Sequence, residues 1–266
     1  NGIVHKTTLD GLDRPSRLRD TKGAADRLNL SYTYDYQNNV TSIINGVDSG
    51  FSLTNLAYDG LDRLTGTTGN TGIGSSTLEY DALGNITRYT SINRSLDYAY
   101  NLANQMTASG TNSYLYDGHN RRVRTQDSKG TTYSFYSLSG QLLYTESADN
   151  GPMSYIFLGK KLIAKTGAGP STPSQSSKQH YKPFGEAIEA PKDDVGYTGH
   201  KFDTDLGLSY MQARYYDPVI GRFYSNDPIG FRDVHSFNRY VYANSNPYKY
   251  TDPDGKAAGL VNKFSE

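Results

Sequence analysis

Hydrophobic and polar residues alternate along much of the first two thirds of the chain. The stretches SYTYD, SYLYD and TYSFY place aromatic or apolar side chains at every second position, a period that is typical of a β-strand. Each stretch leads into a cluster of Asp, Gly and Asn, as in DGLDR, DALGN and DGHNR. These residues tolerate tight or left-handed backbone conformations. The pattern therefore predicts consecutive hairpins, each made of a strand, a turn and a strand.

The predicted hairpins repeat with an irregular period. Thr closes the four clearest copies, which are YDYQNNVT from Tyr34, YDGLDRLT from Tyr58, YDALGNIT from Tyr80 and YNLANQMT from Tyr100. Looser copies start at Leu9, Tyr116, Tyr136 and Phe157. The starts from Tyr34 onward are separated by 24, 22, 20, 16, 20 and 21 residues, whereas helical solenoids have fixed repeat lengths. The spacing thus favours a β architecture.

Composition bears on what kind of interior the hairpins enclose. The chain has 24 Tyr, 27 Gly and 9 Phe, no Trp, 35% hydrophobic residues and a mean hydropathy of -0.68. A disordered chain of low hydrophobicity is poor in aromatic residues and carries a high net charge. This chain is rich in Tyr and formally neutral, so we expect it to fold. A dense aliphatic core is not expected, because Tyr suits half-buried surfaces.

Charge and residue usage exclude several classes of partner and cofactor. The 27 basic and 27 acidic residues balance, so no general attraction to nucleic acid or to an anionic membrane is expected. The absence of Cys excludes disulfides and thiolate metal sites and leaves the compartment open. GNTGIGSS lacks the Lys of a phosphate-binding loop, and no cofactor is expected. No metal is expected either, because the histidines are scattered without zincin spacing; they are His5, His119, His180, His200 and His235.

The organisation of the chain changes at the stretch TGAGPSTPSQSSKQ, which is rich in Gly, Ser, Thr and Pro and marks a loop or linker. We predict a repeat region over residues 1–165, a linker over 166–180, a closing segment over 181–255 and a remnant of a downstream region over 256–266. No run approaches the roughly 18 apolar residues of a membrane helix. The chain opens without Met or a signal-like segment, so we expect a piece of a longer protein.

The closing segment contains one Asp-Pro-x-Gly phrase twice, in SNDPIGF around Asp227 and in YTDPDGK around Asp252. Asp, Pro and Gly at these positions are the residues that a type I turn prefers. The two phrases are therefore read either as two ordinary turns or as two carboxylates brought together for chemistry. The sequence pattern of the phrase by itself favours turns.

The tyrosine–aspartate repeats resemble those of the Rhs (rearrangement hotspot) family, which also occur in the C subunits of bacterial insecticidal toxin complexes and in teneurins. The closing segment resembles the Rhs-associated core through ARYYDPVIGRF, NDPIG and YANSNPYKYTDPDG, in the right order at close spacing. The resemblance covers nearly the whole chain. It implies an all-β fold in which consecutive antiparallel hairpins spiral into a hollow shell, lined by apolar and tyrosine side chains and closed by a C-terminal core plug.

The resemblance also implies a function. The chain would be a fragment of a bacterial polymorphic toxin shell that encapsulates and delivers a C-terminal toxin, secreted or delivered to target cells or associated with the cell surface. Its partners would be its own toxin cargo, the upstream repeats of the shell, and the delivery apparatus of a secretion system or toxin complex. A second class stays open, a noncatalytic carbohydrate-binding or cell-surface scaffold module, because exposed tyrosine ladders can stack on sugars.

In many members of the family the core works as an aspartyl autoprotease. The resemblance maps the essential acidic pair onto Asp227 and Asp252, and an accessory arginine onto Arg214. Such a pair needs one ionised carboxylate to take a proton from water and one neutral carboxyl to donate to the scissile carbonyl. Arg214 has two open readings, a bidentate contact that holds one carboxylate ionised, or a structural ion pair of the plug.

The position of the cut is the point where this sequence departs from the family. Relatives cleave after a large apolar residue that follows the second phrase, whereas Lys256 stands there in this chain. The expected bond joins Lys256 to Ala257. A pocket built for an apolar side chain would have to desolvate an ammonium group, which is costly without a partner. Cleavage at this bond is therefore left open by the sequence.

Overall fold

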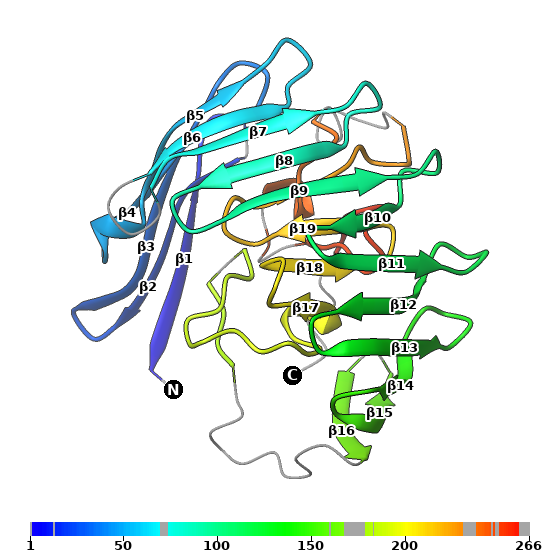
Figure 1. The fold of residues 1–266 in the computed structure, drawn as a ribbon. Helices are drawn as coiled ribbons and strands as arrows, with labels where there is room; N and C mark the ends of the chain where they lie inside the picture. Colours follow the sequence, from blue (N-terminus) through cyan, green and yellow to red (C-terminus); the bar gives the residue numbers. More distant parts are fainter. Residues whose placement is uncertain are drawn as a thin grey trace.

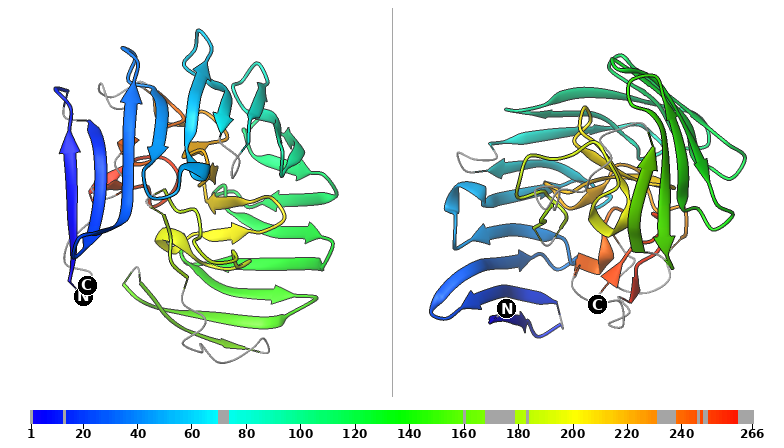
Figure 2. Two further views of the ribbon diagram at one scale, coloured as in Figure 1. Left: turned by 90° about the vertical axis from the view of Figure 1, so that its left-hand side faces the viewer. Right: turned by 90° about the horizontal axis from the view of Figure 1, so that it is seen from below.

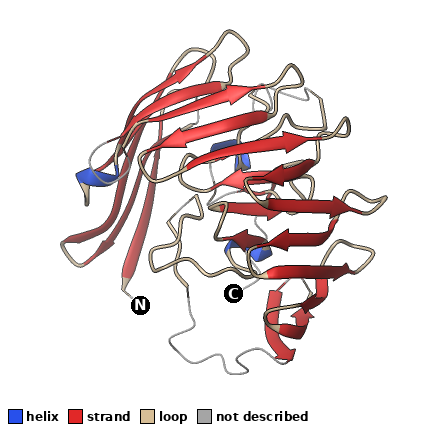
Figure 3. Cartoon of the chain, viewed as in Figure 1, coloured by secondary structure: helices blue, strands red, loops and turns tan. Residues whose placement is uncertain are grey.

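The computed structural model describes residues 2–12, 14–69, 74–159, 161–167, 179–182, 184–230, 238–245, 247 and 250–260. Most of these residues form antiparallel strands (Figure 3). The short 3-10 segments within them are η1 (Ser49–Phe51), η3 (Tyr197–Gly199) and η5 (Ala243–Ser245). No helix in these ranges has the length and apolar character needed to span a membrane. Residues 168–178 of the predicted linker and His235 lie outside the described residues.

The repeat region forms one sheet of 16 strands in sequence order, each antiparallel to its neighbours (Figure 1). Its strands are β1 (Ile3–Leu9), β2 (Pro15–Lys22), β3 (Ala25–Tyr34), β4 (Val40–Asn45), β5 (Leu53–Tyr58), β6 (Leu64–Gly69), β7 (Ser76–Tyr80), β8 (Ile86–Ser91), β9 (Ser95–Tyr100), β10 (Met106–Ser109), β11 (Asn112–Tyr116), β12 (Arg122–Asp127), β13 (Gly130–Tyr136), β14 (Leu142–Ser147), β15 (Gly151–Leu158) and β16 (Lys161–Gly167).

The sheet is curved, and the closing segment lies on its concave side. Figure 2 shows the sheet bending around this segment, with β1 and β16 at its two edges. The closing segment contains a four-stranded sheet of β17 (Lys201–Asp203), β18 (Leu208–Met211), β19 (Arg214–Asp217) and β20 (Arg222–Phe223). It also contains β21 (Tyr250–Thr251), which pairs with β22 (Gly259–Leu260) just after the segment. The all-β fold of consecutive hairpins, with a shell and a C-terminal plug, is confirmed.

The repeated Asp forms the turn of most hairpins, and Asn101 and Ser137 take its place in two of them. Asp81 is representative: its Oδ1 accepts hydrogen bonds from the backbone N–H groups of Leu83 (2.9 Å) and Asn85 (2.8 Å). Gly84, the fourth residue of the turn, has a left-handed φ of 84°. The corresponding residues of other turns are also left-handed, which explains why each is Asn, Asp or Gly; they are Asn38, Asp62, Asn104, Asn120 and Gly140.

The repeated Tyr ties each hairpin to the one before it. Tyr80 ends β7, and its hydroxyl donates to the carbonyl of Leu64, the first residue of β6, at 2.7 Å. The same bond, 2.7–3.0 Å long, joins Tyr34 to Pro15, Tyr58 to Val40, Tyr116 to Met106 and Tyr136 to Arg122. The tyrosine hydroxyls therefore satisfy backbone carbonyls at the start of the preceding second strand. Tyr100 is different, because its buried hydroxyl has no hydrogen-bond partner among the described residues.

Apolar residues of the sheet and of the closing segment form one buried cluster. On the sheet it includes Leu18, Leu30, Val40, Leu64, Ile86 and Met106, and on the closing segment Leu206, Leu208, Tyr210, Tyr215, Ile220 and Tyr224. The cluster covers the concave face of the central strands. A cavity of about 1340 Å³ lies beyond it, between β11–β16 and residues 179–205. The described part of the shell is thus filled in the middle and hollow toward β16.

Two arginines of the repeat region bind carboxylates of the closing segment: Arg122 of β12, which is buried, and Arg94 of the turn between β8 and β9, which is partly buried. Arg122 contacts both oxygens of Asp203, at 2.5 and 3.0 Å. Arg94 contacts Asp217, whose side chain is completely buried. Loss of either arginine charge would remove the nearest cation from a carboxylate of the closing segment in a low-dielectric environment, which is strongly unfavourable. The plug is therefore held at a fixed position on the sheet.

The hydroxyl bond between hairpins can be tested at Tyr80. Substitution Tyr80→Phe leaves the Leu64 carbonyl without its donor, so we expect the free energy of unfolding to fall by about 1–2 kcal/mol. Tyr36→Phe is the matched control, since Tyr36 is 91% exposed, and it should change this free energy by less than about 0.5 kcal/mol. Urea unfolding of both variants measures the difference. Equal losses would contradict the role assigned to the hydroxyl.

Candidate functional site

Arg214 lies at the centre of the closing segment, at the start of β19. Its side chain is 1% exposed, and its guanidinium lies over the Phe223 ring at 3.6 Å. Nε donates to the carbonyl of Gly255 at 2.5 Å, and Nη1 donates to the carbonyl of Arg239 at 2.9 Å. The guanidinium therefore connects three segments that are far apart in the sequence.

The remaining nitrogen of Arg214 connects the two aspartates of the repeated phrase. Nη2 lies 3.3 Å from Oδ2 of Asp227 and 3.3 Å from Oδ2 of Asp252. The two oxygens share one donor, so they cannot be further apart than twice this distance. The sequence left open a bidentate contact between the guanidinium and one carboxylate. In the structure a single guanidinium nitrogen, Nη2, bridges the two carboxylates instead. The structure thus brings together the three residues that the resemblance selected.

The chain bends at each phrase, but no backbone hydrogen bond of a type I turn joins the first and fourth residues of either phrase in the part of the chain that the structure describes. Asp227 Oδ1 accepts a hydrogen bond from the backbone N–H of Ile229 at 2.8 Å. In the second phrase Gly255 has φ of 71°, and a Cβ there would collide with the backbone oxygen of Met211. Local bends and close backbone approach therefore present the two carboxylates, so a bend at each phrase is compatible with the pairing of Asp227 and Asp252.

Asp252 is the more deeply buried of the two carboxyls, with 2% of its side chain exposed against 15% for Asp227. Burial raises the pKa of Asp252, although Arg214 and backbone N–H groups oppose the shift. Desolvation disfavours the charged form of a carboxyl. Of the pair, Asp252 is accordingly suited to hold a proton.

The predicted scissile bond lies against Asp252. Its Oδ1 accepts hydrogen bonds from the backbone N–H of Lys256 at 3.0 Å and from that of Ala257 at 3.1 Å. The second donor is the amide nitrogen of the Lys256–Ala257 bond itself. One carboxyl of the pair therefore touches the peptide group that the family resemblance marks for cleavage.

His200 supports the same turn from the other side. It is 6% exposed, and its Nε2 lies 3.0 Å from the backbone carbonyl of Asp252. Burial lowers the pKa of His200 to about 4, while the bond to this carbonyl opposes the shift. A neutral ring that donates through Nε2 fits this environment. The sequence assigned His200 only an ordinary polar role, because no spacing in YTGHKF links it to a residue 52 positions away.

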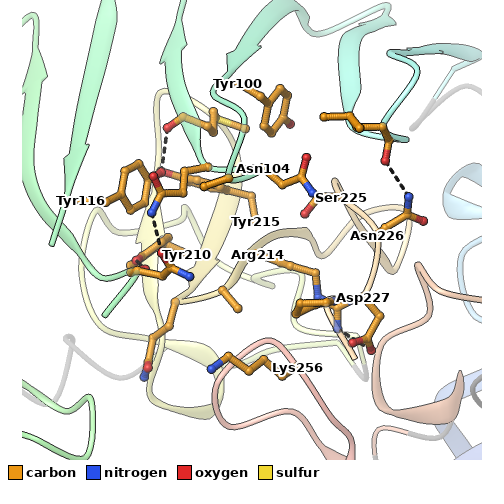
Figure 4. Close-up of a pocket in the computed structure, with 18 of the residues that line it drawn as sticks. Tyr100, Asn104, Tyr116, Tyr210, Arg214, Tyr215, Ser225, Asn226, Asp227 and Lys256 are labelled. Atoms are coloured by element: carbon orange, nitrogen blue, oxygen red, sulfur yellow. Dashed lines mark hydrogen bonds and ion pairs between the residues drawn. The ribbon is translucent and has the colours of Figure 1, made fainter. Parts of the chain in front are cut away.

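A cavity of about 400 Å³ lies beside Arg214 and Asp227 (Figure 4). Shell residues such as Leu83 and Asn104 form one wall, and Tyr210 and Asp227 of the closing segment form another. Lys256 also lines this cavity. The site therefore lies at the interface between the shell and the plug, and residues of both line it.

Comparison with known families agrees with this architecture. A model of the teneurin YD-shell family matches residues 1–169. The chain belongs to the YD-shell family. The membership in the Rhs and YD-repeat group that the tyrosine–aspartate repeats indicate is confirmed.

Curated relatives of this YD-shell chain include toxins and nucleases. The tRNA3(Ser)-specific nuclease WapA of Bacillus spizizenii is 30% identical over 261 residues, which cover 87% of this chain and 11% of the relative. Toxin subunit YenC2 of Yersinia entomophaga is 38% identical over 89 residues, covering 30% of this chain and 9% of the relative. The YD-shell chain spans about a tenth of the length of the curated relatives it matches. These likenesses support a fragment of a polymorphic toxin shell.

Among solved structures, the crystal structure titled TcdB2-TccC3-Cdc42 matches with a TM-score of 0.55 and 17% identity, over 96% of this chain and 18% of that chain. At this identity the likeness concerns the fold. The YD-shell chain with its closing segment therefore shares its fold with part of that structure.

The bridging role of Arg214 predicts a large effect of a small change. In Arg214→Lys a single ammonium replaces a planar group that reaches two carbonyls and two carboxylates, so buried groups lose their partners. We expect the free energy of unfolding to fall by about 3 kcal/mol. The control Arg88→Lys alters a half-exposed ion pair between Arg88 and Asp97 at 3.3 Å. It should change the free energy of unfolding by less than about 0.5 kcal/mol. Denaturant unfolding distinguishes the two; a loss at Arg214 as small as at Arg88 would contradict the bridge.

The buried ring of His200 predicts a pH-dependent contribution to stability. The folded protein binds this proton only below about pH 4, whereas the unfolded chain binds it near pH 6.5. Stability from the neutral ring is therefore lost as the pH falls from about 6.5 to 4. His200→Gln keeps a donor and removes the titration. The unfolding free energy of the wild type, taken relative to that of the variant, should therefore fall by about 3 kcal/mol as the pH falls across this window.

The comparison with the Gln variant cancels the titration of Asp252, which both proteins share. Unfolding free energies measured at closely spaced pH values across this window give the difference curve. Parallel curves for the two proteins would show that His200 does not have the depressed pKa.

Proposed function

We propose that this chain is the closing part of a toxin shell, and that it cuts its own backbone between Lys256 and Ala257. Residues 1–165 would form the shell wall, 166–180 the linker and 181–255 the plug, with the toxin following the cut. The observation that carries the proposal is the position of Asp252: it shares the Arg214 donor with Asp227 and accepts a hydrogen bond from the Ala257 nitrogen. The proposed location is outside the producing cell, after secretion or delivery.

In this proposal Asp227 is the base and Asp252 the acid. Ionised Asp227 takes a proton from water, and the oxygen of that water adds to the Lys256 carbonyl carbon while protonated Asp252 donates to the carbonyl oxygen. The C–N bond then breaks as the proton from Asp227 passes to the Ala257 nitrogen and the new hydroxyl returns its proton to Asp252. The products are a carboxyl group on Lys256 and an amine on Ala257, so atoms and charges balance.

The difference in burial supports this division of roles. The raised pKa of Asp252 favours its neutral form, and Asp227 is more exposed to the water that it would deprotonate. Arg214 holds both carboxyl groups in place and limits their repulsion. We therefore propose Arg214 as a positioning residue for the pair.

The same geometry supports the proposal of encapsulation. The sheet presents its concave face to the closing segment, and a cavity of about 1340 Å³ remains between β11–β16 and residues 179–205. We propose that this hollow is continuous with the space for the toxin in the whole shell, and that upstream repeats extend the sheet beyond β1. The delivery apparatus would be the partner of the assembled shell.

The alternative of a sugar-binding scaffold receives less support. That idea needs exposed tyrosine ladders, whereas most leading tyrosines of the repeats donate their hydroxyls to backbone carbonyls of the sheet. Tyr32, Tyr89, Tyr98 and Tyr114 are buried on the concave side. The tyrosines thus serve the wall and its contact with the plug.

Self-cleavage predicts a defined change of mass. Expressed in its natural sequence context, the protein should separate into a part that ends at Lys256 and a part that begins at Ala257. Asp227→Asn and Asp252→Asn should each slow the cut by at least about 1,000-fold, because the base or the acid is removed. The control Asp149→Asn changes an exposed turn carboxylate and should cut like the wild type. Intact mass spectrometry decides: a wild-type protein that keeps its full mass on long incubation excludes the reaction.

A further inference from the structure

The cavity of about 400 Å³ beside Arg214 has a polar lining. Five side-chain amides face it, from Asn104, Gln105, Asn120, Gln212 and Asn226, together with the hydroxyl-bearing Ser225 and four tyrosines. The aliphatic lining is limited to Leu83, Met106 and small or cyclic residues. A pocket for a large apolar side chain is normally lined by apolar residues. Amides and hydroxyls are unfavourable there, because they lose hydrogen bonds to water when such a side chain enters.

Lys256 belongs to this lining, and its backbone is already fixed by Asp252. In Figure 4 its side chain extends along one border of the cavity, and the ammonium group points away from Asp227. Within the described residues, no hydrogen bond or ion pair of Nζ is found. The residue that precedes the proposed scissile bond is therefore anchored at its N–H and has its side chain at the cavity.

Two residues that line the cavity, Tyr100 and Gln212, carry an acceptor atom that no hydrogen bond between described residues uses. The Tyr100 hydroxyl is buried without a hydrogen-bond partner in the part of the chain that the structure describes, while the matching hydroxyls of Tyr80 and Tyr116 are bound to backbone carbonyls. Gln212 uses its Nε2 to donate to the Gly140 carbonyl at 3.1 Å, which leaves the other end of its amide as an acceptor. An ammonium carries three donors and no acceptor, so it is complementary to such groups.

The charges around the cavity tolerate a further cation. Arg214 is the cationic centre beside it, and both carboxylates of the pair bind this arginine. Arg239 donates through its guanidinium to the backbone carbonyl of Asp227. Because ionised Asp227 offsets the charge of Arg214, repulsion of an ammonium at the far side of the cavity is limited.

We propose that this cavity is the pocket for the residue before the scissile bond, and that its amide and hydroxyl lining makes it selective for lysine at position 256. The inference rests on the self-cleavage proposed above. It assigns Tyr100 and Gln212, on the shell and on the plug, as residues that determine specificity. It also explains how a chain of this family can work with Lys256 where relatives have a large apolar residue.

The test compares rates of cleavage in the natural sequence context, followed by intact mass, for the wild type, Lys256→Leu, Tyr100→Phe and the double variant that carries both substitutions. We expect Lys256→Leu to cut at least about ten times more slowly than the wild type, the loss that follows when buried polar groups are left unpaired. Tyr100→Phe should slow cleavage at least about threefold when Lys256 is present and have no effect in the Lys256→Leu background. Lys6→Leu, on exposed β1, is the control and should cut at the wild-type rate.

The outcomes separate the two proposals. A Lys256→Leu variant that cuts as fast as the wild type, or faster, overturns the pocket assignment and leaves self-cleavage standing. Tyr100→Phe with equal effects in both backgrounds also overturns it. If neither the wild type nor Lys256→Leu cuts, the proposed function fails and the pocket assignment with it. Near-identical urea unfolding of the wild type and the variants shows that the rates report on the pocket and not on folding.

Discussion

The structure depends on the need of an open, curved sheet to bury one of its faces. The 16 strands form consecutive hairpins that hydrogen-bond only to their neighbours, and such a sheet cannot close a core by itself. The closing segment supplies the second layer. Its apolar side chains, Tyr210, Tyr215 and Tyr224 among them, join one cluster with those of the sheet, so the wall and the plug are stable as a pair.

Buried charges then determine where the plug sits. Arg94 and Arg122 extend from the sheet to Asp217 and Asp203, while Arg214 works within the plug and links Asp227 with Asp252. A buried ion pair contributes little net stability over an apolar contact but strongly penalises any arrangement that separates its members. These ion pairs therefore specify one docking geometry of the plug on the sheet. The acidic pair and the cavity beside it form at this interface between shell and plug.

Much of the wall could be predicted from the sequence because its signals are local. Tyr80 and Asp81 stand at the end of a strand and the start of a turn, and their neighbours in sequence are their partners in space. The pairing of Asp227 with Asp252 came from the resemblance, since nothing in the two phrases reveals that they meet. The contribution of His200 and the environment of the Tyr100 hydroxyl could not be predicted, because both depend on contacts between residues far apart in the chain.

The hydroxyl bonds and turns of the repeats couple each hairpin only to the next, so the wall taken alone resembles a one-dimensional array that unravels from its ends. The plug changes this behaviour. Asn238 binds Asn39, Asn226 binds the Leu83 carbonyl and Tyr210 binds the backbone of Arg122, so distant hairpins share one rigid body. An array braced in this way opens as a unit where the plug contacts it, whereas strands without such contacts open independently and at a lower free-energy cost.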